Sequence, residues 1–286
     1  MKYQEYHEVI RGQLEEQFAQ EGKNIETAAK YCAESVKSGR VIHVFGCGHS
    51  QMFAMEVFYR AGGLVPVNAL LIPHMALFPK AKLSTLQERI EGFCGQYLQL
   101  EDTDPRDTMI VVSISGRNAG VVDMALEAKA IGMKVIALTS RQFSSSTTSR
   151  HSSGKHLADV ADVVIDVKCV SGDAALSMDG LEPHFCGTST VLGMGNALGG
   201  RIGAMVSGFV YGLELILFSG FTYSLFNHFA AVGAEGTGHD CIDAMALMTI
   251  MKNPVVGIII IVGAFILASV LVVRYQKKVA EKSQAA

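Results

Sequence analysis

The stretch Val41-Ile42-His43-Val44-Phe45-Gly46-Cys47-Gly48-His49-Ser50 decides the fold. Its first half is rich in β-branched and aromatic side chains, which predicts a short buried strand. Its second half holds two glycines, which allow the backbone to turn sharply. Residues 51–60 then follow a helical pattern that ends at a pair of glycines. The stretch therefore predicts a strand, a tight turn and a helix in succession.

Similar units recur along the first two thirds of the chain. Apolar, β-rich runs predict four further strands, and helical segments separate them. This alternation predicts βαβ units, and hence an α/β fold whose mainly parallel sheet has helices on both faces. The expected strands span residues 64–71, 109–112, 134–138 and 163–167, after an amphipathic helical region at 3–38.

The turn at residues 46–50 has the features of an anion site. Gly46 and Gly48 let the backbone approach a ligand closely, and the next helix offers unpaired N–H groups and its positive dipole end. Ser50 adds a hydroxyl, and His49 lies within the same turn. The third glycine of a dinucleotide fingerprint and the Lys-Ser/Thr ending of a nucleotide phosphate loop are both missing. We therefore expect a phosphate ligand but no nucleotide cofactor.

A second turn strengthens this interpretation. Ser113-Ile114-Ser115-Gly116-Arg117-Asn118 also joins an expected strand to an expected helix. Ser113, Ser115 and Asn118 surround Gly116, where they can ring a phosphate, although such residues also cap helices. A third hydroxyl-rich helix start holds Ser189 and Thr190. Two polar turns in one sheet favour a joint site.

In their order along the chain, these turns resemble the SIS (sugar isomerase) domain family of phosphosugar isomerases and phosphosugar-binding regulators. Residues 149–155, 161–166 and 172–176 are similar to a bacterial group with a single SIS domain, called UPF0309. The resemblance covers about residues 1–194, so residues 1–195 are assigned to a phosphosugar-binding domain. It implies a flavodoxin-like, three-layer αβα fold with a five-stranded parallel sheet. It also implies a homodimer, in which two subunits often share each ligand site.

The same resemblance implies which residues hold the sugar phosphate. They are Gly46, Gly48, His49, Ser50, Ser113, Ser115, Gly116 and Asn118, with Ser189 and Thr190 nearby. Asn118 stands where the family more usually has threonine.

Catalysis is a separate question, because an aldose–ketose isomerase needs a base that moves a proton and an acid that opens the ring. The candidates are Glu182, Glu56 and His49. Each has an ordinary alternative as a solvated side chain, and for His49 ligand contact is favoured over catalysis. No cluster of residues has metal-ligand spacing, so no metal is expected. The chain is thus either an isomerase or a binding module without catalysis.

Composition and charge exclude some other classes of protein. A net charge of -3 argues against a nucleic-acid partner. The six cysteines are scattered and the N-terminus lacks an apolar stretch, which favours reduced thiols in the cytoplasm and no secretory signal. The serine- and threonine-rich residues 142–154 predict either a solvated loop or a flap near the ligand.

Residues 196–286 differ in composition from the rest of the chain. Two apolar runs, about 203–229 and 254–273, predict a transmembrane helical hairpin in contact with lipid. The basic residues after the second run place both termini in the cytoplasm, which predicts a membrane-associated chain. The stretch after 194 resembles the end of a phosphotransferase-system permease of the ascorbate or galactitol type. A phosphosugar sensor at the membrane and a permease fragment are therefore alternative functions.

Overall fold

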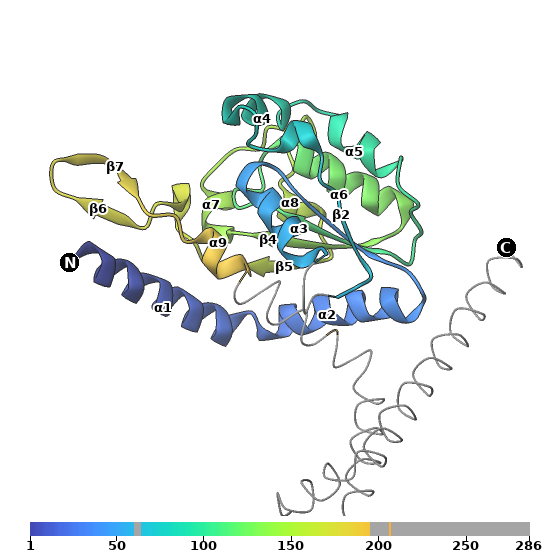
Figure 1. The fold of residues 1–286 in the computed structure, drawn as a ribbon, viewed down its shortest axis with the longest axis horizontal. Coiled ribbons are helices and arrows are strands. Elements are labelled where there is room, and N and C mark those ends of the chain that lie inside the picture. Colours follow the sequence, from blue (N-terminus) through green and yellow to red (C-terminus); the bar gives the residue numbers. More distant parts are fainter. Residues whose placement is uncertain (60–63, 195–205, 207–286) are drawn as a thin grey trace, which may run out of the picture. The chain divides into compact units, whose positions relative to one another are not determined.

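The computed structural model describes residues 1–59, 64–194 and 206 (Figure 1). Contacts divide the chain into two units, Met1–Tyr211 and Gly212–Ala286, and the described residues all belong to the first unit. The predicted spans at 203–229 and 254–273 lie outside the described residues, apart from Val206.

A parallel five-stranded sheet forms the centre of the domain. Its strand order is β2-β1-β3-β4-β5, the flavodoxin-like order that the sequence resemblance implies. Every residue of β1 and β3 is buried, as expected for strands that are covered on both faces. The strands are β1 (Ile42–Gly46), β2 (Val67–Ala69), β3 (Thr108–Val112), β4 (Lys134–Thr139) and β5 (Val163–Asp166).

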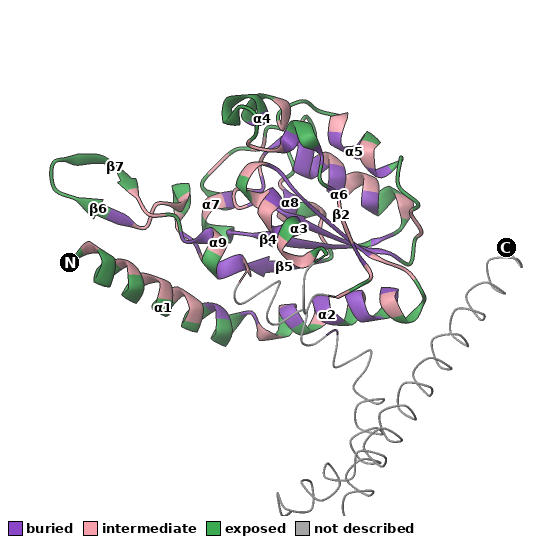
Figure 2. Cartoon of the chain, in the orientation of Figure 1, coloured by how far each residue is buried: buried purple, intermediate pink, exposed green. Residues whose placement is uncertain are grey.

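Helices cover the sheet on both sides, which completes three layers (Figure 1). On one face, Val44 and Ile110 belong to a core cluster that includes residues of α2 and α3. On the other face, Phe45 and Val111 pack in a cluster with residues of α5 and α6. Successive side chains along each strand thus point to opposite faces, and both faces of the sheet are buried (Figure 2). The helices are α1 (Lys2–Gln20), α2 (Gly22–Lys37), α3 (Gln51–Val57), α4 (Ala81–Gln87), α5 (Phe93–Leu98), α6 (Ala119–Ile131), α7 (Arg141–Ser145), α8 (Leu157–Val160) and α9 (Ser189–Leu192), with 3-10 turns η1 (Gly48–Ser50), η2 (Pro73–Met75) and η3 (Ser171–Asp173).

A two-stranded hairpin follows the sheet and was not predicted. β6 (Leu176–Met178) and β7 (Leu181–Phe185) pair antiparallel and project from the body of the domain beside α1 (Figure 1). Most of their residues are exposed. Without a buried face the hairpin has no apolar alternation, so its sequence lacks the usual strand signal.

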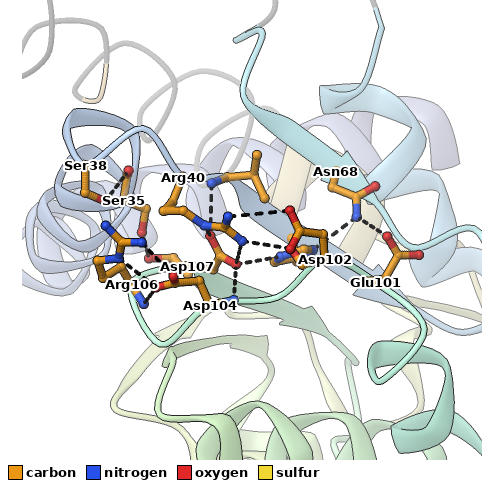
Figure 3. A network of polar contacts seen from close by, with 12 residues as sticks. Ser35, Ser38, Arg40, Asn68, Glu101, Asp102, Asp104, Arg106 and Asp107 are labelled. Atoms are coloured by element: carbon orange, nitrogen blue, oxygen red, sulfur yellow. Dashed lines mark hydrogen bonds and ion pairs between the residues drawn. The ribbon is translucent and has the colours of Figure 1, made fainter. Parts of the chain in front are cut away.

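A buried ionic network ties the amino ends of β1 and β3 together (Figure 3). The fully buried carboxylate of Asp107 accepts hydrogen bonds from Arg40 Nε at 2.9 Å, Arg40 Nη2 at 2.9 Å and the backbone of Val41 at 3.1 Å. His43 Nε2 lies 3.3 Å from the same carboxylate. Burial by itself would raise the pKa of Asp107, but these hydrogen bonds outweigh it and hold the pKa well below the usual range. The network lies at the opposite end of the sheet from the predicted phosphate turns.

The expected membrane-associated localisation is corrected. Over the described ranges 1–59, 64–194 and 206, no helix has both the length and the apolar character needed to cross a bilayer. The longest of these helices, α1, has 19 residues, but it carries charged side chains such as Lys2, Glu5 and Arg11. For these residues the prediction of a membrane-associated chain with two cytoplasmic termini is wrong, and the lipid partner expected with it is unsupported.

Candidate functional site

The first turn is built around two glycines at the carboxyl end of β1. A Cβ atom on Gly46 would lie 2.4 Å from the carbonyl oxygen of Ser50, so no side chain fits between the strand and the following helix. Gly48 has a φ of 59°, in the left-handed region that glycine adopts at low cost. Both glycines are therefore needed to bring the start of η1 and α3 close to the strand end, as the sequence predicts.

The side chains of this turn divide between the interior and the surface. Cys47 is buried, and its hydrogen bond with the Cys94 thiol together with burial raises its pKa well above the ordinary value. It anchors the turn against α5 and is not a reactive thiol. Ser50 is half-buried and His49 is exposed. Of the predicted ligands of this turn, His49 and Ser50 thus lie at or near the surface, whereas Gly46 is buried in β1.

The second turn, between β3 and α6, is shaped by its own serine. The buried Ser113 Oγ accepts a hydrogen bond from the backbone of Gly116 at 3.2 Å. Gly116 has a φ of 61° and packs against Thr139 and Leu157, so this position also needs glycine. Ser115 is half-buried at the middle of the turn. Ser113 therefore fixes the loop, while Ser115 is the serine whose hydroxyl is better placed to meet a ligand.

Asn118 does not play the capping role that the sequence left open. Its backbone occupies the N-cap position of α6, but its side chain makes no capping hydrogen bond. Instead Oδ1 accepts a hydrogen bond from Arg150 Nη1 at 2.6 Å, and the side chain also bonds to the carboxyl of Glu88. The Arg150 contact was not predicted, because the two residues are 32 positions apart in sequence.

The sheet brings the two turns to one place. Gly46, the last residue of β1, pairs with Val112, the last residue of β3. The chain leaves β1 toward β2 on one side and enters β3 on the other, which makes this pair the point where the strand order reverses. Open parallel sheets bind ligands at such a point, outside the carboxyl ends of the strands. The predicted joint site thus has the expected framework.

At the third predicted turn, the carboxylate of Asp173 occupies the start of the helix. Asp173 accepts hydrogen bonds from the backbone N–H groups of Thr188 and Ser189, both at 3.0 Å, and from the Ser189 hydroxyl at 2.6 Å. Its carboxylate caps the N-terminus of α9. Ser189 is therefore engaged within the chain, whereas Thr190 is half-buried. The role of Asp173 was missed, because it lies 16 residues before Ser189.

The three candidate catalytic residues do not come together in one chain. Glu56 lies on α3 and is half-buried, and His49 lies in the turn that begins this segment. Glu182 is exposed on β7, in the hairpin that projects away from the sheet (Figure 1). Among the described residues, no group of three or more His, Cys, Asp or Glu side chains could hold a metal ion.

The loop between α7 and α8 lies against the second turn. The backbone N–H of Arg150 donates to the carbonyl of Arg117 at 2.8 Å, in addition to its side-chain bond with Asn118. The N–H of Leu157 donates to the carbonyl of Gly116 at 2.8 Å. These contacts favour the interpretation of residues 142–154 as a flap over the site rather than a free solvated loop.

Comparisons with known proteins agree on the first part of the chain. The model of the SIS domain matches residues 5–140. A UPF0309 protein of Geobacillus kaustophilus is 41% identical over 189 residues, which cover 66% of this chain and 75% of that protein. A UPF0309 protein of Thermoanaerobacter pseudethanolicus is 44% identical over 192 residues, covering 66% of this chain and 78% of the relative. The permease resemblance of the last ninety or so residues receives no support from these matches.

Among solved structures, a phosphoheptose isomerase from Francisella tularensis is similar over 73% of this chain and 96% of that chain. Its TM-score is 0.48 and its sequence identity 18%, values too low to transfer an activity.

Proposed function

Because the chain belongs to the UPF0309 family and carries a SIS domain, we propose that it binds a phosphorylated sugar between the turns after β1 and β3. The observation that carries this proposal is the pairing of Gly46 with Val112, which sets the two glycine- and hydroxyl-rich turns side by side. Each turn ends at the start of a helix, where free N–H groups favour a phosphate.

The residues proposed to bind the sugar phosphate have two kinds of role: some shape the turns, and others contact the phosphate or the sugar. Gly46, Gly48 and Gly116 shape the turns, and the hydroxyls of Ser50 and Ser115 donate to phosphate oxygens. His49 lies at the exposed edge of the first turn, where it can meet the sugar. Ser113 and Asn118 act by fixing the second turn, since both have partners within the chain. Thr190 contributes from the side of α9.

The test is binding by the full chain, measured by calorimetry and by thermal shift, with fructose 6-phosphate and fructose as a matched pair. A ligand that binds the folded state alone raises the melting temperature. We expect the phosphate ester to bind and fructose to leave the melting temperature unchanged. Equal responses to the two would contradict a phosphate site.

Ser115→Ala is the informative variant, and Ser38→Ala is its control. Ser38 is an exposed serine at the end of α2, near the ionic network at the amino ends of the strands (Figure 3). We expect Ser115→Ala to weaken sugar-phosphate binding about tenfold, as for one hydrogen bond to a charged group. We expect Ser38→Ala to bind normally. Unchanged binding by Ser115→Ala would remove this residue from the site.

Aldose–ketose isomerisation is the reaction that such a site would support. One group takes a proton from the carbon beside the carbonyl and returns it to the neighbouring carbon through an enediol, while a second group opens the ring. Glu56 is favoured as the base because α3 begins directly after the phosphate turn. Exchange of substrate hydrogen with deuterated water, followed by NMR, tests this step. Binding without exchange over a panel of aldose and ketose phosphates would make the chain a binding module.

Glu182 could act only in a neighbouring subunit's site, since the hairpin that carries it points away from its own sheet (Figure 1). The hairpin exposes Met178 and Leu181, and isolated two-stranded hairpins are marginal in water. We therefore propose a homodimer in which this hairpin contacts the second copy. Sedimentation analysis of the chain tests it, and a monomer at micromolar concentration would refute it.

A further inference from the structure

Three arginines gather at the second turn from three separate segments. Arg117 belongs to the turn itself, Arg150 to the flap and Arg89 to the connection between α4 and α5. The flap and the turn are joined by the backbone bond from Arg150 to Arg117 and by the bond from Arg150 Nη1 to Asn118. Burial and the neighbouring charges of Arg117 and Arg89 lower the pKa of Arg150, as expected for guanidinium groups held close together.

The positive charge of this cluster is not balanced. In the part of the chain that the structure describes, Arg89, Arg117 and Arg150 form no salt bridge. Among the described residues, the acidic group whose charge acts on Arg150 is the carboxyl of Glu88. Burial raises the pKa of Glu88, which weakens its ability to compensate three cations. The turn therefore carries an excess of positive charge beside the proposed phosphate site.

One guanidinium also has an unused donor. Arg117 Nε is buried and has no hydrogen-bond partner among the described residues. A buried N–H of a cation without an acceptor is costly, and native proteins nearly always satisfy such groups. An anion placed between the turn and the flap would supply this acceptor and balance the charge.

The flap is held by contacts that do not involve the arginines. His151 Nε2 lies 3.1 Å from Asp123 Oδ1 on α6, and the backbone of Ser152 donates to Glu91 at 2.9 Å. The side chains of His151 and Asp123 are nearly buried. Arg150 is thus presented at the second turn by a fixed framework, in spite of the repulsion between the like charges.

We propose that Arg117 and Arg150, with Arg89 at their rim, bind a second anionic group of the ligand. The ligand would then be a sugar phosphate with a further carboxylate or phosphate. This inference rests on the proposed function and names its substrate class. Guanidinium groups bind both kinds of anion through paired hydrogen bonds, which explains why arginine stands at these positions rather than a neutral polar residue.

The test compares ligands with one and two anionic groups. Fructose 6-phosphate is the single anion, while fructose 1,6-bisphosphate and 6-phosphogluconate add a phosphate and a carboxylate. We expect at least one of the doubly anionic probes to bind the full chain more than tenfold tighter than fructose 6-phosphate, at a fixed salt concentration. The probe whose affinity increases more over that of fructose 6-phosphate shows whether the second group is a phosphate or a carboxylate.

Arg117→Gln and Arg150→Gln then locate the effect. Each should lower affinity for the doubly anionic probe about ten- to a hundredfold, as for loss of a charged hydrogen bond. Arg117→Gln should change affinity for fructose 6-phosphate less than twofold, whereas Arg150→Gln should lower it by a smaller factor than for the doubly anionic probe, because Arg150 also supports Asn118. Arg150→Lys should recover part of the loss, because it keeps the charge. Arg106→Gln is the matched control, since Arg106 pairs with Asp104 at the other end of the sheet and should have no effect.

Other outcomes overturn the proposal in distinguishable ways. Equal losses for all three ligands would show that the arginines hold the shared phosphate, which leaves the proposed function intact. Unchanged binding of every ligand by both variants would show that the cluster binds no ligand. Absence of binding by the unaltered chain to any of these probes would refute the proposed function together with this inference.

Discussion

Replacing Asp107 with asparagine tests whether the ionic network at the amino ends of the strands stabilises the fold (Figure 3). The buried carboxylate accepts from two nitrogens of Arg40 and from the backbone of Val41 and Asp104, and it faces His43. Asparagine keeps the shape, but it removes the charge and turns an NH₂ group toward donors. Breaking a buried ion pair on one side costs about 3–5 kcal/mol, because the remaining charge loses its buried partner; here Arg40 would keep only the exposed Asp102.

The assay is urea unfolding of the full chain at pH 7, followed by circular dichroism. We expect Asp107→Asn to lose about 3–5 kcal/mol of the free energy of unfolding. Asp102→Asn is the control, since Asp102 is exposed and lies 3.6 Å from Arg40, and it should lose less than about 1 kcal/mol. A loss below about 1 kcal/mol for Asp107→Asn would refute the view that this network stabilises the sheet.

The same variant should change the response to acid. The pKa of Asp107 is lower in the folded protein than its ordinary value. Its contribution to stability is therefore present above the unfolded pKa, about 3.9, and is lost as the pH falls toward the folded value. Below about pH 4 the unaltered chain should lose stability more steeply than Asp107→Asn. Parallel stability curves for the two proteins would contradict this assignment.

Three further predictions follow from local geometry. Gly46→Ala should abolish sugar-phosphate binding, measured by calorimetry, because its Cβ would lie 2.4 Å from a backbone oxygen; Gly12→Ala, with nothing within 4 Å, should bind normally. Burial raises the pKa of Cys32 and Cys169 to about 12, so iodoacetamide at pH 8 should label both only after unfolding, as read by mass spectrometry. Asp173→Ala should lower the free energy of unfolding in urea by about 1–2 kcal/mol, because α9 loses its capping carboxylate; an unchanged midpoint would contradict that role.

The sequence predicts the sheet and its turns well because their signals are local. The run at 42–46 is β-rich, and the glycines that follow it are required by the backbone of the same turn. The hairpin at 176–185 has no such signal, since its residues are exposed and do not alternate. Asp173 and Arg150 were missed for a different reason. Their partners lie 16 and 32 residues away, and only the folded chain brings them together.

Asn118 shows how one side chain can organise this part of the site. A primary amide has an acceptor and two donors on opposite sides, so it can bond to a cation and to a carboxyl at the same time. Asn118 does this with Arg150 and Glu88. Asn118 therefore supports Arg150 at the second turn, where the guanidinium charge lies beside the proposed phosphate site.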